Sequence, residues 1–359
     1  MVLTSNKQFV KFLFKSIFLF AILIFCHDGN AQDKARVVPK KPNISSTMVY
    51  DTGWRDMLCL DNPIQQTPYL DQMSNEGAVF DRFYYVSAVC APTGSSVMNG
   101  STPLGIDMKY CCSRYIGSCF DLFPGYLKKK GYAIGHFGKW YLGTMSKHPV
   151  DFPEQGRSSF KDFSRPGGDG FDLCFSTHNV VFTWDHMELP DQVGNWSFHR
   201  RSDDGWWGQY YSDEIGYMYS PDNSSLQGND SRIIMNKVLP FIESRISGGY
   251  PFLTVIWFHA PYTPTVAGDE FPRMYAGCEE RHRYGVISAM DAEIKRLRKF
   301  LAKLGVAKNT LIWFCSDNGA AKYNSNFGDY GGFGSNEPSR GWKIQLYKGE
   351  ITLVLNVAS

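Results

Sequence analysis

The feature that most constrains the fold is an alternation of short apolar runs with helical patterns. Residues 132–137, 251–258 and 310–315 are strand-like, and amphipathic helical patterns at 230–242 and 287–304 precede the last two runs. This alternation predicts an α/β fold in which a mainly parallel sheet is sandwiched by helices. With 359 residues, the chain is long enough to bury a substantial core.

Polar side chains follow these three runs and a fourth, partly polar strand-like run after Lys-Pro-Asn at 41–43. Asp51, Lys139 and His259 each end one run, and Asp317 with Asn318 ends another. Ligands of such sheets bind beyond the carboxyl ends of the strands, so we expect these groups to converge on one rim. Any one of them alone is more often structural, but four at strand ends indicate a site. Asp51, Asp317 and Asn318 offer hard oxygen ligands for Ca²⁺ or Mg²⁺.

A further candidate lies in the stretch Val-Cys-Ala-Pro-Thr-Gly-Ser-Ser at 89–96. A small residue, a proline and a hydroxyl cluster after Cys90 are typical of a tight turn that opens a helix. Backbone N–H groups would then face a charge that develops near Cys90. An isolated cysteine is more often a small buried apolar residue, and it is the motifs elsewhere in the chain that favour a functional role.

The ordered motifs over residues 41–351 resemble those of the sulfatase family. Its signature C-x-P-S/T-R is matched at Cys90, Pro92 and Thr93, whereas Gly94 takes the place of the arginine. The other similar motifs are K-P-N at 41–43, T-P-Y-L-D at 67–71, G-K-W-Y-L-G at 138–143, H-A-P at 259–261 and R-G-W-K at 340–343. The resemblance implies an alkaline phosphatase-like fold, that of the sulfatase N-terminal domain, and sulfuric ester hydrolase activity.

The resemblance also implies roles for these residues. Cys90 would be oxidised to formylglycine, whose hydrate attacks sulfur, releases the alcohol and then expels sulfate; a plain thiol lacks the second hydroxyl that this cycle needs. Lys139 and Lys343 would balance charge on the sulfate oxygens, where one preorganised donor contributes about 3 kcal/mol. His259 would donate a proton to the departing alcohol oxygen. Asp51, Asp317 and Asn318 would bind Ca²⁺, with Mg²⁺ as the alternative.

The expected partners follow from the same resemblance. They are a sulfated carbohydrate or an aryl sulfate ester as substrate, and a formylglycine-generating enzyme during export. The formal net charge of +2 and the scarcity of basic blocks indicate no nucleic-acid partner.

Several positions depart from the family pattern. Tyr50 replaces the first of two aspartates, Tyr141 and Tyr262 replace histidines, and Gly94 replaces the arginine. These departures leave a second hypothesis open: a catalytically impaired relative that binds sulfated glycans, or a degenerate copy. A phosphatase or phosphodiesterase of the wider alkaline phosphatase-like superfamily is a third hypothesis, disfavoured by the C-x-P-T motif.

The N-terminus predicts export. Basic residues precede an apolar run at 16–26, and small residues follow it before Gln32. This order predicts a signal peptide at 1–31 and a secreted, periplasmic or lysosomal protein, with a retained membrane anchor as the alternative. Residues 32–40 are expected to be a linker and 41–359 the sulfatase-like domain. The family's smaller C-terminal subdomain is expected to be largely absent, which would leave apolar surface bare.

Nine cysteines suit an oxidising compartment. Cys111, Cys112 and Cys119 are the candidates for a local disulfide, without a readable pairing. Residues 150–230, rich in Gly, Trp, Asp and Ser, are expected to form loops on the substrate side.

Overall fold

The computed structural model describes residues 41–57, 62–103, 122–143, 145, 164–167, 170–178, 181–185, 210–212, 217–218, 223–268, 270–322, 330–332, 334–345, 347 and 352–358. The predicted signal peptide and linker belong to a separate unit, residues 1–40, outside the described residues. Cys111, Cys112, Cys119 and most of the loops at 150–230 also lie outside, so the expectations for them stay predictions. No helix of the described segments is long and apolar enough to cross a membrane.

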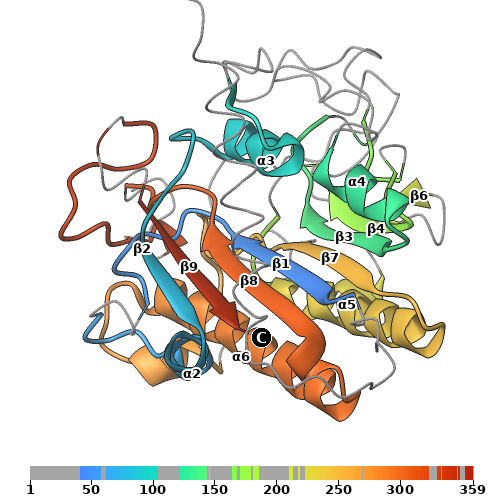
Figure 1. Ribbon diagram of the computed structural model, residues 1–359. Helices are drawn as coiled ribbons and strands as arrows, with labels where there is room; N and C mark the ends of the chain where they lie inside the picture. The colour runs from blue at the N-terminus through green and yellow to red at the C-terminus, as the bar shows by residue number, and fades with distance from the viewer. Residues whose placement is uncertain are drawn as a thin grey trace, which may run out of the picture. The chain divides into compact units, whose positions relative to one another are not determined.

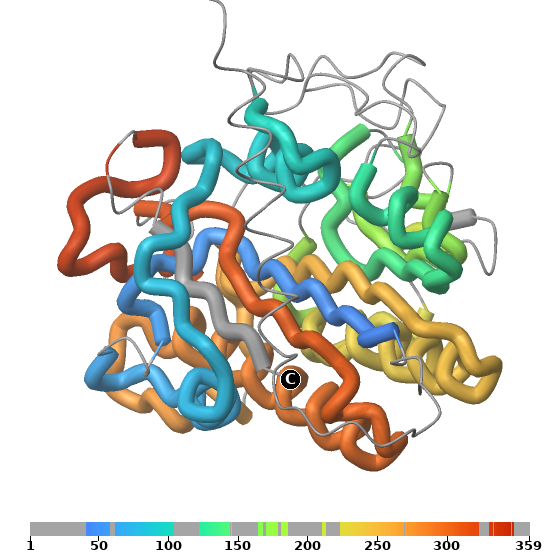
Figure 2. Tube along the Cα trace, in the orientation of Figure 1, coloured from blue at the N-terminus to red at the C-terminus, as the bar shows by residue number. Residues whose placement is uncertain are grey.

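Strands of the described chain form a single mixed sheet. They are β1 (Asn43–Val49), β2 (Ala78–Tyr84), β3 (Ala133–Lys139), β4 (Leu173–Thr177), β5 (Tyr210–Ser212), β6 (Tyr217–Met218), β7 (Phe252–Trp257), β8 (Thr310–Ser316) and β9 (Thr352–Ala358). Their order is β2-β9-β8-β1-β7-β3-β4-β5-β6. The central strands β8, β1, β7, β3 and β4 are parallel, and they run side by side in Figure 2. Antiparallel pairs complete both edges.

Helices cover the parallel part of the sheet. The α-helices are α2 (Pro68–Glu76), α3 (Cys90–Asn99), α4 (Phe123–Lys129), α5 (Asp230–Ser247) and α6 (Arg281–Lys303), and the 3₁₀-helices are η8 (Ser224–Leu226), η9 (Pro272–Tyr275) and η10 (Ala307–Asn309). Helices α5 and α6 pack against each other on one side of the sheet (Figure 1). Helix α3 contacts α4, and α4 in turn contacts β3.

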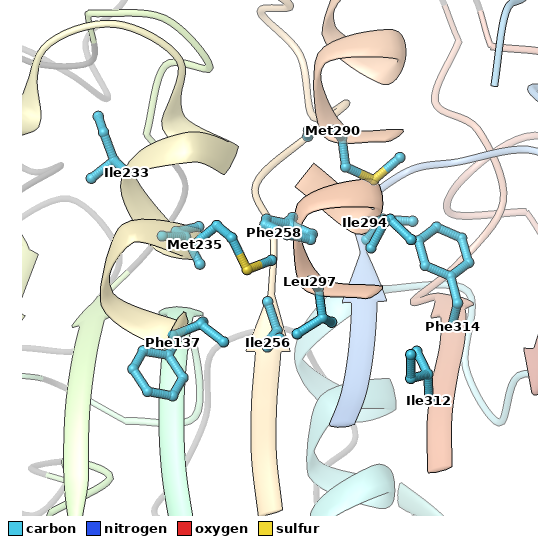
Figure 3. Packing of buried hydrophobic residues seen from close by; sticks show 14 of the residues in the cluster. Phe137, Ile233, Met235, Ile256, Phe258, Met290, Ile294, Leu297, Ile312 and Phe314 are labelled. Carbon is cyan, nitrogen blue, oxygen red and sulfur yellow. The ribbon is translucent and has the colours of Figure 1, made fainter. Parts of the chain in front are cut away.

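The larger apolar core lies between the parallel strands and helices α5 and α6 (Figure 3). Along α6 the buried residues recur every three or four positions, which places them on one face of the helix. They include Ile287, Met290, Ile294, Leu297 and Leu301. Fully burying one such side chain contributes about 1.5–3 kcal/mol. A second cluster, which includes Cys90, Tyr50 and Trp257, is separate from the first.

Strand β1 lies at the centre of the sheet although its sequence is partly polar. Ser45 and Thr47 are fully buried. Thr254 on β7 donates a hydrogen bond to the Ser45 hydroxyl at 3.0 Å. The Asn43 side chain donates to the Thr310 hydroxyl at 3.3 Å and accepts from the backbone N–H of Phe252 at 3.4 Å. Cross-strand hydrogen bonds therefore satisfy Ser45 and Asn43, whereas the buried Thr47 hydroxyl has no hydrogen-bond partner within the described segments.

The predicted α/β class is confirmed, but several elements differ from the expectation. Helix α6 begins at Arg281, earlier than the expected 287, and β9 was not predicted. Strands β4, β5 and β6 lie within residues 150–230, so the expectation that this range forms loops is wrong for these segments. Strand β2 is an antiparallel strand at the edge of the sheet. Its direction could not be predicted from the sequence, because a hydrophobic pattern carries no information about strand direction. Its apolar side chains Val79, Phe80, Phe83 and Tyr84 are 39–45% exposed.

Candidate active site

Helix α3 begins at Cys90 itself, within the stretch in which the sequence predicts a tight turn that opens a helix. Val89 before it is extended, with φ −147° and ψ 152°, and the helix ends at Gly100 in the left-handed region with φ 67°. Pro92 lies in the first turn, where a missing N–H leaves no helical hydrogen bond unmade. The fold thus holds the Cys90 side chain at a helix N-terminus, whose partial positive charge favours an anion.

The Cys90 thiol is buried and contacts a lysine. Its exposed fraction is 4%, and Lys343 Nζ donates to Sγ at 3.2 Å. Burial raises the pKa of the Cys90 thiol well above its ordinary value, and Asp317 raises it further, although Lys139 and Lys343 act in the opposite direction. An unmodified thiol is therefore protonated at neutral pH and is a weak nucleophile.

The carboxyl ends of β1 and β8 place three oxygen-bearing side chains together. The backbone N–H of Asp51 donates to Asp317 Oδ1 at 3.0 Å, and Asn318 Nδ2 donates to Asp51 Oδ1 at 2.7 Å. Lys343 Nζ lies 2.6 Å from the same Asp51 oxygen. Asp51 itself has φ 58°, an uncommon conformation for a residue other than glycine. The predicted convergence of Asp51, Asp317 and Asn318 is therefore present.

These residues fit a divalent cation. Ligand atoms of Asp51, Cys90 and Asp317 lie within 4.8 Å of one another. Asp317 Oδ2 and Asn318 Oδ1 are buried and, within the described segments, have no hydrogen-bond partner. Buried oxygen acceptors without donors are costly unless a cation or water satisfies them. Their chemistry suits Ca²⁺ or Mg²⁺.

Charge in this cluster is unevenly balanced. The pKa of Asp317 is raised to about 6: burial raises it most and Asp51 adds to the increase, whereas Lys343 and Lys139 oppose it. Burial alone would lower the pKa of Lys343, but Asp51 and other neighbouring acidic groups raise it well above its ordinary value. Lys343 therefore stays charged beside Asp51.

Sequence reasoning missed a buried ion pair behind this cluster. Arg283 on α6 donates to Asp56 Oδ2 at 2.5 Å, to the carbonyl of Asp51 at 2.8 Å and to that of Pro261 at 3.2 Å. Asp56 also accepts from the backbone N–H groups of Gly53 and Ser335. The pair therefore ties the loop after β1 to the loop after β7. Its partners are 227 positions apart, so no local pattern signals it.

Lys139 ends β3 and is 1% exposed. Its Nζ lies 3.8 Å from the centroid of the Tyr50 ring, 4.5 Å from that of Tyr141 and 4.9 Å from that of Tyr262. The three tyrosines that depart from the family pattern thus surround one ammonium group.

His259 does not join the cluster. It is fully buried, with Nδ1 2.8 Å from Asp230 Oδ2 and Nε2 2.8 Å from the Thr177 hydroxyl. Tyr210 donates to the other Asp230 oxygen at 2.5 Å. Both ring nitrogens are engaged in this buried network. The proton-donor role expected of His259 from the sequence stays a prediction.

Gly94 lies against Trp257. A Cβ atom at this position would be 3.1 Å from the Trp257 ring and 3.6 Å from the Leu142 side chain. Trp257 is fully buried. The space beside Gly94 on this face of α3 is therefore filled, and a long side chain there requires Trp257 to move.

Comparison with known proteins decides the family. A family model described as Sulfatase matches residues 43–346, a range that contains every predicted site residue. This chain belongs to the sulfatase family. N-acetylgalactosamine-6-sulfatase of Homo sapiens is 28% identical to it over 300 residues, which cover 79% of this chain and 51% of the relative. Steryl-sulfatase of Rattus norvegicus is 26% identical, covering 86% of this chain and 61% of the relative.

This sulfatase-family chain spans about half the length of the N-acetylgalactosamine-6-sulfatases that it matches. Among solved structures, Ps i-CgsB in complex with k-i-k-neocarrahexaose aligns with a TM-score of 0.70 at 20% identity, over 89% of this chain and 66% of that chain. The predicted alkaline phosphatase-like fold is thereby confirmed.

Proposed function

We propose that this protein is a sulfuric ester hydrolase that acts on a sulfated carbohydrate or an aryl sulfate ester. The observation that carries the proposal is the convergence of Cys90, Lys343 and Asp51, whose side chains make direct contacts at the carboxyl edge of the sheet. The net reaction consumes one water for each ester and releases the alcohol, sulfate and a proton.

The residues of the chain have separate tasks in this proposal. Cys90, oxidised to formylglycine by a formylglycine-generating enzyme during export, holds the attacking position at the start of α3. Lys343 and Lys139 balance the charge of the sulfate oxygens. Asp51, Asp317 and Asn318 hold Ca²⁺ or Mg²⁺, which when bound supplies positive charge to the oxyanion. His259, whose ring nitrogens contact Asp230 and Thr177, would donate a proton to the departing alcohol oxygen.

The substrate class is supported by the relatives. Those with the names N-acetylgalactosamine-6-sulfatase and arylsulfatase are 27–28% identical to this chain. A solved structure in complex with its substrate D-glucosamine-2-N,6-O-disulfate shares the fold, with a TM-score of 0.58 at 18% identity. We accordingly favour a sulfated sugar or a small aryl ester, and export through the predicted signal peptide at 1–31.

A second candidate function is the binding of sulfated glycans without turnover. It is favoured by the buried, protonated Cys90 thiol and by Gly94, where the family signature has arginine. If Cys90 is not oxidised, the rim retains its cationic groups but has no nucleophile that completes the cycle. A degenerate copy would instead fail to give a folded protein.

The test uses the full chain made in a host with formylglycine-generating activity. Mass spectrometry of the tryptic peptide that contains Cys90 reports whether the thiol is converted to the aldehyde or its hydrate. We expect the aldehyde and release of 4-nitrophenol from 4-nitrophenyl sulfate in the presence of Ca²⁺. Cys90→Ala should abolish turnover, whereas Cys278→Ala, at another free and less buried cysteine, should not.

Two results would redirect the proposal. An unmodified thiol with saturable binding of a sulfated oligosaccharide would favour the second candidate. Faster hydrolysis of 4-nitrophenyl phosphate than of the sulfate would favour the phosphatase hypothesis; the fold shared with a phosphonate monoester hydrolase of Agrobacterium radiobacter, at a TM-score of 0.57 and 14% identity, makes this a necessary comparison.

A further inference from the structure

The three tyrosines around Lys139 come from separate elements of the fold. Tyr50 follows β1, Tyr141 follows β3 and Tyr262 follows β7. Each ring centroid lies within 5 Å of the ammonium nitrogen, closer than the roughly 6 Å limit of a cation–π contact. Three separate strand ends thus supply one aromatic cage.

Backbone geometry supports a specific placement of these rings. The N–H of Tyr50 donates to the carbonyl of Ala260 at 3.1 Å, and that of Tyr262 donates to the carbonyl of His259 at 2.8 Å. Tyr141 has φ 56°, in the left-handed region that a bulky residue rarely adopts. Such strain persists only where the surrounding structure imposes it, and it is concentrated at functional sites.

Within the described part of the chain, the Lys139 ammonium group contacts ring faces and makes no hydrogen bond. Among the described residues, no carboxylate lies within salt-bridge distance of its ammonium group. A ring face attracts a cation through its quadrupole, which is neutral overall. Lys139 therefore keeps both its net charge and its N–H donors for an anion. Its charge reaches the site, because Lys139 acts to lower the pKa of both Cys90 and Asp317.

Tyr262 also links Lys139 to Lys343. The Lys343 ammonium lies 4.6 Å from the centroid of the Tyr262 ring, compared with 4.9 Å for that of Lys139. One ring thus contacts two cations, and its quadrupole offsets part of their mutual repulsion. Both cations act on the Cys90 thiol, whose pKa they lower.

We propose that Tyr50, Tyr141 and Tyr262 are positioning residues that hold Lys139 to receive the oxyanion of the substrate. They act through Lys139 and not by contacting the reacting atoms. The inference rests on the proposed function for the identity of the anion. It assigns one shared role to three positions at which the sequence comparison shows only separate departures from the family pattern.

The first test measures sulfate binding by calorimetry in the full chain. Tyr262→Phe keeps the ring and should bind inorganic sulfate within about twofold of the parent, whereas Tyr262→Leu should bind roughly 2- to 30-fold more weakly. Tyr126→Leu is the matched control, because Tyr126 on α4 is 58% exposed and its ring centroid lies 5.5 Å from the Lys130 ammonium nitrogen, outside the site. Equal affinity of the Phe and Leu variants, or no sulfate binding by the parent, would overturn the inference.

The second test needs no variant of the cage and no catalysis. In protein labelled with ¹³Cε-lysine, ring currents should shift the Lys139 signal upfield, with Lys139→Arg used only to assign that signal. An ordinary chemical shift for Lys139 in the folded protein would overturn the inference. An upfield signal and sulfate binding without ester turnover would support the cage and would count against hydrolysis, so the two proposals fail separately.

Discussion

The two lysines of the site carry the same charge but are held in opposite ways. Lys343 donates to Asp51 at 2.6 Å and to Cys90 at 3.2 Å, so its hydrogen-bond donors are engaged with acceptors of the chain. Lys139 lies against ring faces, and no described carboxylate pairs with it. The difference teaches that one half of the site is organised by charge pairing, and the other half by aromatic packing.

The consequence is a difference in what each lysine leaves behind when it is removed. Without Lys343, the Asp51 carboxylate, whose side chain is 2% exposed, loses its nearest cation. Without Lys139, only neutral rings remain. Variants that remove each lysine should therefore differ in their effect on stability, and this difference tests the contrast between the two halves of the site.

The largest effect is expected for Lys343→Met in the absence of divalent cations. Breaking a buried ion pair by removing one partner costs about 3–5 kcal/mol, whereas Lys139→Met should cost about 1–2 kcal/mol, the strength of the cation–π interactions that this variant removes. Urea denaturation in EDTA measures both free energies of unfolding. Lys308→Met, at an exposed lysine before β8, is the control. Equal losses for Lys343→Met and Lys139→Met would remove the distinction.

A second prediction concerns Asp317→Asn. Because this variant removes one negative charge from the charge-paired half, Ca²⁺ affinity should fall by on the order of 100-fold in calorimetric titrations. Glu337→Gln is the matched control, since Glu337 is an exposed partner of Arg55 and its loss should leave Ca²⁺ binding unchanged. Retained affinity in Asp317→Asn would show that the cation does not bind at this cluster.

A third prediction concerns the contact between Gly94 and the aromatic ring of Trp257. Gly94→Arg restores the family signature in sequence but forces Trp257 to move, so it should destabilise the fold by about 1–3 kcal/mol, the usual cost of overpacking. Val97→Arg on the same helix should be tolerated, because Val97 is 42% exposed. Thermal denaturation compares them, and a melting temperature unchanged by Gly94→Arg would contradict the packing argument.

The smallest expected effect is a pH dependence of stability. The pKa of Asp317 is raised to about 6 in the folded protein, chiefly by burial, so the folded state binds this proton more tightly than the unfolded state. Without metal, its contribution to stability is complete below about pH 4 and is lost as pH rises through about 6. Between pH 4.5 and pH 7 in EDTA, the parent should therefore lose about 1–2 kcal/mol more than Asp317→Asn. Parallel curves would show that Asp317 ionises normally.

Much of the charge-paired half could be predicted from the sequence. Asp317 and Asn318 follow an apolar run and Asp51 follows a partly polar one, and parallel strands bring such ends to one edge. The aromatic half could be read only as departures from a family pattern, because nothing in the positions of Tyr50, Tyr141 and Tyr262 shows that their rings meet. Arg283 was missed because its partner Asp56 is distant in sequence and its own helix shows only an amphipathic pattern.

The sequence by itself determined the α/β class, a turn that opens a helix near Cys90 and the set of polar groups at the strand ends, because periodicity and strand ends are local properties of the chain. Tertiary structure alone decided where those side chains point. It turned His259 inward to Asp230 and Thr177 and gathered three tyrosines around Lys139. The physical reason is that side-chain direction depends on packing between strands and helices far apart in the chain, which no local pattern records.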